Sequence, residues 1–359
     1  MRIAITTGGG DAPGLNAVIR AVVLGAHHRG WQCYGIQRGY DGLLGGSRVV
    51  PLGPADVRGI THLGGTILGT TNRGNPFRYA VTQPDGRVVE ADRSDELVAA
   101  FHASGFDALI AIGGDGSLGI AHQLGEKGIP VVGVPKTIDN DVAVTERTFG
   151  FDTAVATATD ALDKLHSTAE SHDRVMVVEV MGRTAGWIAL SAGLSGSADV
   201  ILLPEVPFDI EKVCAKIMAR ERAGRHFSVV VVAEGAAPAG GTVELIERRG
   251  AGTVERLGGV AGRVAHAIGQ RTGKEVRTMV LGHLQRGGSP TTFDRLLGLR
   301  FGAAAVRAVA DGDFGTLVAL RGDDVVRIPL ALAAGQPRLV PVGCDTLQTA
   351  RDLGISLGD

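Results

Sequence analysis

The sequence is poor in cysteine, balanced in charge and without long hydrophobic runs, and each of these absences excludes a class of protein. Its 359 residues hold three cysteines, Cys33, Cys214 and Cys344, whose wide spacing indicates neither a disulfide framework nor a zinc site. The 36 Lys+Arg and 38 Asp+Glu leave a net charge of −2, which argues against binding to nucleic acid or to a membrane surface. Apolar runs such as 229–233 are far too short to span a membrane. We therefore expect a soluble cytoplasmic protein.

Glycine is plentiful, with 54 residues, and it stands mostly at the ends of short apolar runs, where tight turns need it. Strands are expected at 3–7, 108–113, 131–134, 174–180, 200–203, 227–233 and 276–282. Helices are expected at 14–29, 94–104, 117–127, 150–169, 183–194, 209–223 and 258–271. The strand runs are β-branched and almost continuously hydrophobic, as parallel strands covered on both faces are. This alternation predicts an α/β fold with two doubly wound, mainly parallel-sheet lobes and an active site in the cleft between them.

The lobe boundaries have weaker signals, because no repeat and no Pro/Ser-rich linker divides the chain. We place the first lobe at 1–140 and the second at 141–305. The remaining residues, 306–359, are expected to pack back on the first lobe.

Two glycine-rich turns stand between a strand and a helix. GGGDAPG at 8–14 lets backbone N–H groups approach an anion at a helix N-terminus, although such a segment alone is more often a simple turn. IGGDGS at 112–117 adds one carboxylate, Asp115, which either binds Mg²⁺ or caps the helix. Magnesium takes few protein carboxylates and keeps its other positions for water and phosphate oxygens, so a single aspartate fits it. Similar GGDG loops occur in NAD kinases and lipid kinases.

A third turn, PKTIDND at 135–141, carries two aspartates two residues apart, which point to the same side of an extended chain. One of them can accept the proton of an attacking hydroxyl, and the other can support a metal or hold the loop. The alternative is an Asx-rich turn without chemistry.

Several cationic side chains stand at strand ends beside glycine turns, where a guanidinium can bind phosphate oxygens. They are Arg174, Arg183, Arg277, His283 and Arg286. Arg183 is expected at a helix start, and Glu234 at a strand end could accept hydrogen bonds from sugar hydroxyls. For any one of them a surface or capping role is the alternative.

Together these motifs resemble the 6-phosphofructokinase family. The match runs from Ile3 to about Gly302, and GGGDAPGLNAVIR, GGDGS, TIDND, GFDTA, VVEVMGR, LPE and LGHLQRGG occur in the family's order. The resemblance implies transfer of a phosphoryl group from ATP to the 1-hydroxyl of fructose 6-phosphate in glycolysis, with Mg²⁺ as cofactor. The first lobe then binds the donor and the second lobe binds the sugar phosphate.

The resemblance also assigns roles, with Asp139 as the proton acceptor, Asp115 as the Mg²⁺ ligand and Arg183 stabilising the transferring group. The residues implied in catalysis are Asp139, Arg183, Lys136 and Gly116. The residues implied at the ATP site are Gly10, Arg73, Gly74, Gly114, Asp115, Gly116 and Ser117. The residues implied at the fructose 6-phosphate site are Thr137, Ile138, Asp139, Arg174, Met181, Gly182, Arg183, Glu234, Arg277, His283, Leu284, Gln285 and Arg286.

The phosphoryl donor is the open point. Gly116 leaves room for the α-phosphate of ATP, where an Asp would repel it. Lys136 is instead typical of pyrophosphate users, but a subgroup of the family carries both residues and uses ATP, and this sequence resembles that subgroup. The alternatives are a pyrophosphate-dependent enzyme or a kinase that also accepts sedoheptulose 7-phosphate. The family further implies a homodimer or homotetramer in which Arg174 and Arg277 reach a neighbouring subunit's sugar site.

Overall fold

The computed structural model describes residues 1–45, 48–71, 74–247, 256–333, 335 and 337–359. They form two compact units, one of residues 1–152 and 286–337 and the other of residues 153–247, 256–285 and 338–359. The division differs from the predicted one at the C-terminal side. Residues 286–305 belong to the first unit rather than the second, and residues 338–359 belong to the second unit rather than the first.

The first unit is built on a seven-stranded sheet with the order β15-β14-β7-β6-β1-β2-β3. Its strands are β1 (Arg2–Thr7), β2 (Gln32–Ile36), β3 (Val49–Leu52), β6 (Ala108–Gly113), β7 (Val131–Pro135), β14 (Thr316–Arg321) and β15 (Asp324–Pro329). The five central strands run parallel, and only the edge strands β3 and β15 are antiparallel to their neighbours. The glycine-rich turns after β1 and β6 therefore lie at the same edge of the sheet.

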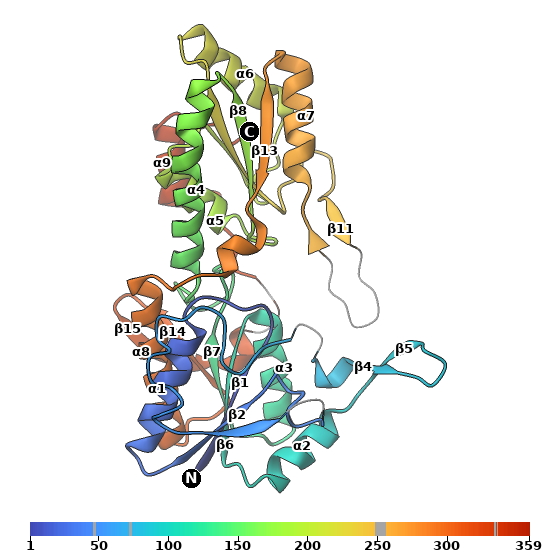
Figure 1. The fold of residues 1–359 in the computed structure, drawn as a ribbon, viewed down its shortest axis with the longest axis vertical. Coiled ribbons are helices and arrows are strands. Elements are labelled where there is room, and N and C mark those ends of the chain that lie inside the picture. The colour runs from blue at the N-terminus through green and yellow to red at the C-terminus, as the bar shows by residue number, and fades with distance from the viewer. Residues whose placement is uncertain (46–47, 72–73, 248–255, 334, 336) are drawn as a thin grey trace. The chain divides into compact units, whose positions relative to one another are not determined.

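Alternate residues of these strands pack under different helices. Ile3 and Ile5 face a core with α1 (Leu15–His27) and α8 (Thr292–Ala310), whereas Ala4 faces a core with α2 (Ser94–Ala103) and α3 (Asp115–Glu126). Helices α1 and α8 lie side by side on one face (Figure 1). They can approach closely because residue 302 is a glycine. The Cβ of any other residue there would lie 2.6 Å from the Val18 carbonyl oxygen. Both faces of the sheet are covered, which explains the continuously apolar strands.

The second unit holds a smaller, wholly parallel sheet with the order β13-β8-β10-β9. Its strands are β8 (Val175–Val180), β9 (Val200–Leu202), β10 (Ser228–Ala233) and β13 (Val276–Val280). Its helices are α5 (Trp187–Ser195), α6 (Ile210–Arg222), α7 (Val260–Thr272) and α9 (Asp345–Asp352), with α4 (Phe151–Ser171) beginning at the end of the first unit. Helices α6 and α7 pack on one face of the sheet, and α5 contacts β9 and β10.

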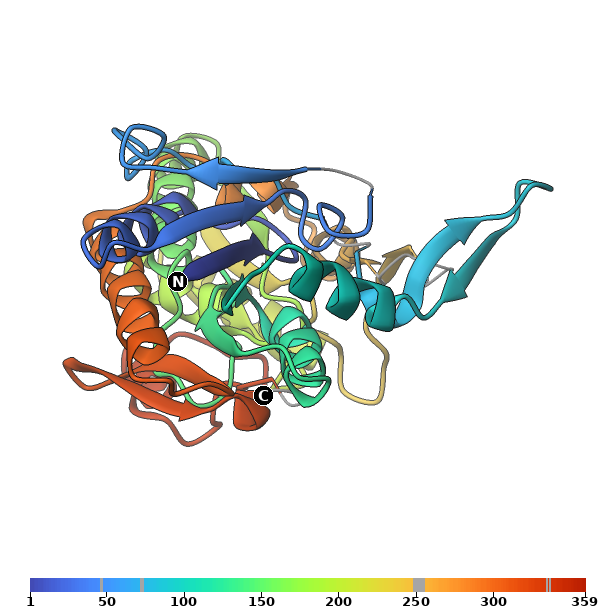
Figure 2. The same ribbon diagram turned by 90° about the horizontal axis from the view of Figure 1, so that it is seen from below.

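The remaining elements are short. Two antiparallel hairpins pair β4 (Tyr79–Thr82) with β5 (Val88–Ala91), and β11 (Leu245–Glu247) with β12 (Arg256–Leu257). The first hairpin extends away from the sheet of the first unit (Figure 2). Three 3₁₀ helices are η1 (Pro76–Arg78), η2 (Gly282–Arg286) and η3 (Leu330–Ala333).

The predicted α/β class with mainly parallel sheets is confirmed, and each of the seven predicted strands is present. One predicted boundary matters for function. The pattern predicts a helix from residue 183, but α5 begins at Trp187, so Arg183 lies in the loop before the helix.

None of the helices in the described ranges has both the length and the apolar character needed to cross a membrane.

Candidate active site

The two glycine-rich turns of the first unit meet at Ser117. A Cβ at Gly8 would come within 2.9 Å of the Ser117 Oγ, and a Cβ at Gly113 would come within 2.3 Å of the Ser117 Cβ. The Gly8 N–H also donates to the Ile112 carbonyl at 2.9 Å. Side chains at these glycines would push the turns apart, so glycine is required by contact.

Helix α3 begins directly at the second turn, with Gly114 as its N-cap and Asp115 as its first residue. Gly116 is exposed, and a Cβ placed there would meet no atom within 4 Å. The helix N-terminus therefore offers its N–H groups and open space beside a carboxylate, a setting that suits a phosphate group.

Thr71 and Gly74 lie near the first turn. The Gly9 N–H donates to the Thr71 carbonyl at 3.3 Å, and a Cβ at Gly74 would lie 2.8 Å from the Thr71 Cγ2. Gly74 thus lies beside the turn of 8–14, with which the family resemblance groups it. Arg73 falls outside the described residues.

Lys136 connects the loop after β7 to both turns. Its N–H donates to the Gly113 carbonyl at 2.8 Å, and its Nζ donates to the Gly10 carbonyl. The side chain is only 3% exposed. Burial, followed by the charge of Arg286, lowers the pKa of Lys136 to about 8, while Asp139, Asp11 and Asp141 act in the opposite direction.

The loop that carries Asp139 is held by its own near neighbours. The Asp139 N–H donates to the Thr137 Oγ1 at 3.0 Å. The Asn140 Oδ1 accepts from the Thr148 N–H at 3.1 Å, and the Thr148 Oγ1 donates to the Thr137 carbonyl at 2.8 Å. Asn140 has φ 53°, a left-handed conformation that asparagine tolerates better than most residues. Side chains of Thr137, Asn140 and Thr148 thus hold the backbone that carries Asp139.

Three carboxylates converge near this loop. The pKa of Asp141 is raised by burial first and then by the charges of Asp139 and Asp115. The excess of negative charge favours a cation at this place. Within the described part of the chain, no group of three or more His, Cys, Asp or Glu side chains could hold a metal ion by itself. Magnesium does not need such a cage when phosphate oxygens supply the other ligands.

Arg286 belongs to the first unit, although it ends the HLQR segment. Its Nη1 donates to the Asp11 carbonyl at 3.0 Å. A Cβ at Gly10 would lie 2.6 Å from the Arg286 Nη1. Asp11 was part of a predicted motif but had no predicted role. The preceding residues differ in exposure: Gln285 is fully buried, His283 is exposed and Leu284 is 69% exposed.

In the second unit, Arg183 stands in a loop between β8 and α5 with φ 54°. The Arg183 N–H donates to the Glu234 Oε1 at 2.9 Å, and a Cβ at Gly235 would come within 2.1 Å of the Arg183 carbonyl oxygen. Glu234 at the end of β10 therefore lies beside the loop of Met181, Gly182 and Arg183. The Arg183 side chain is exposed.

The other two arginines that the sequence analysis placed at the sugar site in the second unit, Arg174 and Arg277, share one partner. The Arg174 Nη2 lies 2.9 Å from the Glu275 Oε1, and the Arg277 Nη2 pairs with the same oxygen. Arg277 is on β13, an edge strand whose Met279 and Val280 are exposed. Both guanidiniums are thus gathered at this edge.

The comparisons with known proteins agree on one family. The phosphofructokinase family profile matches residues 2–309. This chain is a member of the phosphofructokinase family. It is 55% identical to a protein of Chloroflexus aurantiacus named ATP-dependent 6-phosphofructokinase, covering 100% of this chain and 98% of the relative. It is 54% identical to a protein of Amycolatopsis methanolica named pyrophosphate–fructose 6-phosphate 1-phosphotransferase, covering 95% of this chain and 96% of the relative.

A solved structure shows the same fold. The crystal structure of Pichia pastoris phosphofructokinase in the T-state is 31% identical, with a TM-score of 0.79 over 92% of this chain. This chain spans only 35% of that longer chain.

The structure shows positioning contacts of residues to which the sequence analysis gave no role. Thr148, Asn140 and Asp11 position the loops of the first unit, and Glu205 does so in the second, because its Oε1 accepts from the Gly186 N–H at 3.0 Å. Ile138 is fully buried, and its Cγ2 would lie 3.4 Å from a Cβ at Gly150, so its side chain packs in the interior.

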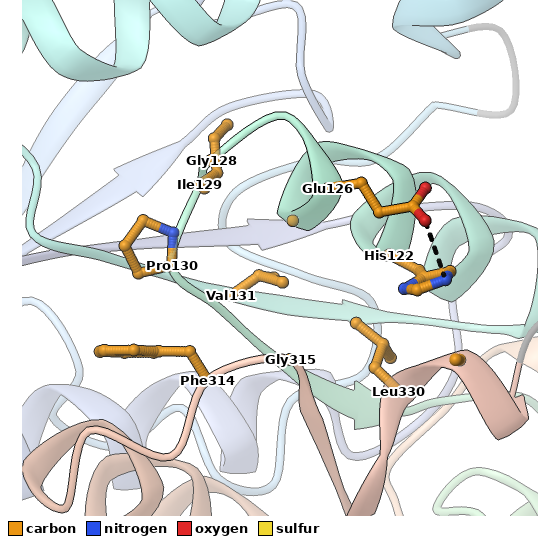
Figure 3. Close-up of a pocket in the computed structure, with 11 residues that line it drawn as sticks. His122, Glu126, Gly128, Ile129, Pro130, Val131, Phe314, Gly315 and Leu330 are labelled. Carbon is orange, nitrogen blue, oxygen red and sulfur yellow. Dashed lines mark ion pairs between the residues drawn. The ribbon is translucent and has the colours of Figure 1, made fainter.

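A cavity of about 460 Å³ in the first unit lies away from these residues (Figure 3). It opens at the far end of α3, between His122, Glu126, Ile129 and Phe314. The His122 Nε2 lies 3.9 Å from the Glu126 Oε1, and most of the other lining is apolar. The cavity lacks the grouped carboxylates and glycine turns found around Asp115, so we do not place the chemistry there.

Proposed function

We propose that this protein is an ATP-dependent 6-phosphofructokinase, a phosphotransferase that phosphorylates the 1-hydroxyl of fructose 6-phosphate to give fructose 1,6-bisphosphate and ADP in glycolysis. The observation that carries the proposal is the gathering, in the first unit, of two glycine-rich turns, the buried Lys136 and the Asp139 loop. Lys136 contacts both turns through the Gly113 and Gly10 carbonyls. The names of relatives at 48–55% identity support it.

Asp139 is the proposed general base. It is 6% exposed, and its backbone is held through Thr137, so a sugar hydroxyl can meet a carboxylate in a defined position. It removes the proton of the 1-hydroxyl as the oxygen attacks the terminal phosphorus. The bond to the ADP oxygen breaks in the same step.

Cationic side chains compensate the charge of the transferring group. Lys136 and Arg286 flank Gly10 from two sides, and Arg183 supplies an exposed guanidinium in the second unit. Such charges stabilise the transition state when they are already oriented before the reaction. We assign the phosphates of the donor to Gly10, Lys136 and Gly114–Ser117.

Mg²⁺ is the proposed cofactor, with Asp115 as its protein ligand. The raised pKa of Asp141 beside Asp139 and Asp115 supports a cation there, since each of these carboxylates repels the next. When bound, Mg²⁺ neutralises phosphate charge and orients the donor. Asp141 then becomes easier to ionise and holds the loop of Asp139.

The sugar phosphate is assigned to residues from both units. Thr137 and Asp139 receive the 1-hydroxyl, while Glu234 and the loop of Met181, Gly182 and Arg183 receive the sugar. Phosphate recognition falls to the cationic residues. These are His283, Arg286, Arg174 and Arg277, with Ile138, Leu284 and Gln285 shaping the same region.

The choice between ATP and pyrophosphate as the phosphoryl donor rests on Gly116. The relatives named for ATP and for pyrophosphate are 55% and 54% identical to this chain, so identity does not choose between them. The open space at Gly116 supports ATP, because an additional phosphate can lie there. Lys136 serves either donor and keeps the pyrophosphate-dependent enzyme as the alternative.

A donor-by-acceptor matrix tests the function, with ATP and pyrophosphate each assayed against fructose 6-phosphate and sedoheptulose 7-phosphate at equal Mg²⁺. We expect the highest kcat/KM for ATP with fructose 6-phosphate. A higher value with pyrophosphate would establish the alternative, and no turnover of either sugar phosphate would refute the proposal.

Substitution of Gly116 tests the donor assignment itself. Gly116→Asp should abolish ATP use by repelling the α-phosphate, whereas Gly116→Ala should keep it, because a Cβ meets no atom within 4 Å. ATP turnover by the Asp variant at the rate of the Ala variant would contradict the assignment.

We further propose a homodimer or homotetramer in which Arg174 and Arg277 serve the sugar site of a neighbouring subunit. The exposure of the β13 edge strand around Arg277 supports this. Mixing inactive Asp139→Asn with inactive Arg277→Ala should then restore activity, because some mixed sites receive both intact residues. Mixtures no more active than their parents would exclude sharing.

A cytoplasmic location completes the proposal. Cys33 and Cys214 are buried free thiols, which suit a reducing compartment.

A further inference from the structure

The backbone of the loop that carries Arg183 is held by side chains from distant parts of the chain. Arg183 has φ 54°, a conformation that is unfavourable for a residue other than glycine and persists only where the surroundings impose it. Within the loop, the Ala185 N–H donates to the Gly182 carbonyl at 2.9 Å. The next two described contacts come from carboxylates far along the chain, Glu234 at the Arg183 N–H and Glu205 at the Gly186 N–H.

The Glu205 side chain binds the last residue of the Arg183 loop, Gly186. Both of its carboxylate oxygens accept from the Gly186 N–H, at 3.0 and 3.2 Å. A Cβ at Gly186 would come within 2.7 Å of the Glu205 Oε2, so only glycine permits this approach. Gly186 is the N-cap of α5, and a carboxylate is favourable at a helix N-terminus.

The same carboxylate also binds the C-terminal tail, which we define as residues 338–359. The Val340 N–H donates to the Glu205 Oε1 at 2.8 Å. One residue after Gly186, the Trp187 Nε1 donates to the Arg338 carbonyl at 2.8 Å, and the Arg338 guanidinium lies 4.3 Å from the centre of the Trp187 ring. The tail is thus joined to the end of the loop in two ways, through the Glu205 carboxylate and through Trp187.

The tail itself is anchored in the second unit at its other end. Ser356 forms backbone hydrogen bonds with Asp199, just before β9, and with Ile201 in β9. The Gly358 carbonyl accepts from the Asp209 N–H at 2.7 Å. Between these points, α9 packs against α5 (Figure 1). Leu347 and Ala350 on α9 are fully buried. The tail is therefore a fixed part of the unit and can act as a support.

We propose that Glu205 is a positioning residue for phosphoryl transfer. It joins the Arg183 loop to the C-terminal tail and so holds the Arg183 guanidinium at the transferring group. This inference rests on the proposed function for the role of Arg183, but the restraint on the loop does not. Small displacements of a group that stabilises the transition state lower kcat.

The test compares Glu205→Ala and Glu205→Gln with matched changes at Glu211, a carboxylate on α6 in the same unit that pairs with Arg271. Glu205→Ala should lower kcat by about tenfold or more, because loss of position is costly. Glu205→Gln keeps an acceptor oxygen for both N–H groups and should restore most of the activity. Trp187→Phe, which removes the bond to the Arg338 carbonyl and leaves a smaller aromatic ring beside the Arg338 guanidinium, should give a smaller loss in a folded protein.

A double-substitution cycle separates positioning from general stability. If Glu205 acts through Arg183, Glu205→Ala should cause no further loss of kcat in an Arg183→Ala background. An equal loss in both backgrounds, or a lower melting temperature with kcat unchanged, would overturn the proposal.

Hydrogen exchange supplies a readout that does not depend on activity. The amides of 183–187 should exchange faster in Glu205→Ala than in Glu211→Ala. Unchanged exchange would overturn the inference even in an active enzyme. Faster exchange in a protein that phosphorylates neither sugar would refute the proposed function while upholding the restraint.

Discussion

The loop after β7, with Asp139, and the loop after β8, with Arg183, carry the two central groups of the proposed site, and they are held in different ways. Around Asp139 the loop after β7 is held by partners 2 to 11 positions away along the chain, and at its start Lys136 joins it to Gly113 and Gly10. The Arg183 loop and the start of α5 have one local bond, from Ala185 to Gly182, and are otherwise held by partners 19, 51 and 151 positions away. A base needs one exact position for one proton, and around Asp139 that position is set by side chains of the same loop. The arginine loop instead depends on the state of the whole second unit.

The largest effect is expected at the base. Asp139→Asn should lower kcat by about a thousandfold, because the amide cannot accept the proton. Asp160→Asn, which removes a surface carboxylate paired with Lys164 on α4, is the control and should be neutral. Equal kcat for the two variants in a coupled ADP-release assay would remove Asp139 from the chemistry.

The buried cation between the two turns should give the next effect. Because the pKa of Lys136 is lowered to about 8, the free enzyme loses this positive charge as the pH rises through that value. We therefore expect kcat/KM to fall above about pH 8. Lys136→Met should be about a hundredfold less active at pH 7 and lack this alkaline limb. A wild-type profile that stays flat to pH 9.5 would contradict the assignment.

The local character of the Asp139 loop can be tested at Thr148. Thr148→Val leaves the buried Thr137 carbonyl without its donor and should destabilise the first unit by about 1–3 kcal/mol. Thr148→Ser keeps the hydroxyl and should cost less. Denaturant unfolding measures the stability, and exchange at 183–187 should not change. Faster exchange there would mean that the two loops are not held separately.

The smallest effect is expected at the tail side chain. Arg338→Ala removes the guanidinium from the Trp187 ring but leaves the carbonyl that binds Trp187, so the loss should be about 0.5–1 kcal/mol in stability. kcat should stay close to that of the wild type. A large loss of kcat would show that the side chain, rather than the backbone of the tail, supports the Arg183 loop.

The comparison also explains what could be predicted. The Asp139 loop, the glycine turns and the strands before them are each one uninterrupted segment of the chain. Residue type and spacing therefore predict them. The strands β14 and β15 were not predicted, although they extend the large sheet beside β7. The boundary at 305 was wrong because α8 carries no signal that it packs on α1. The role of Arg286 at Gly10 and Asp11 was invisible for the same reason, since 275 positions separate it from Asp11.

The sequence by itself determined the fold class, most of the parallel strands and the chemical groups at their ends, because these follow from local hydrophobic pattern and turn residues. Only the tertiary structure decided that the C-terminal tail belongs to the second unit and that Glu205 links it to the Arg183 loop. Backbone N–H and carbonyl groups form most of these contacts. Every residue except proline has both groups, so no residue type marks such contacts in the sequence.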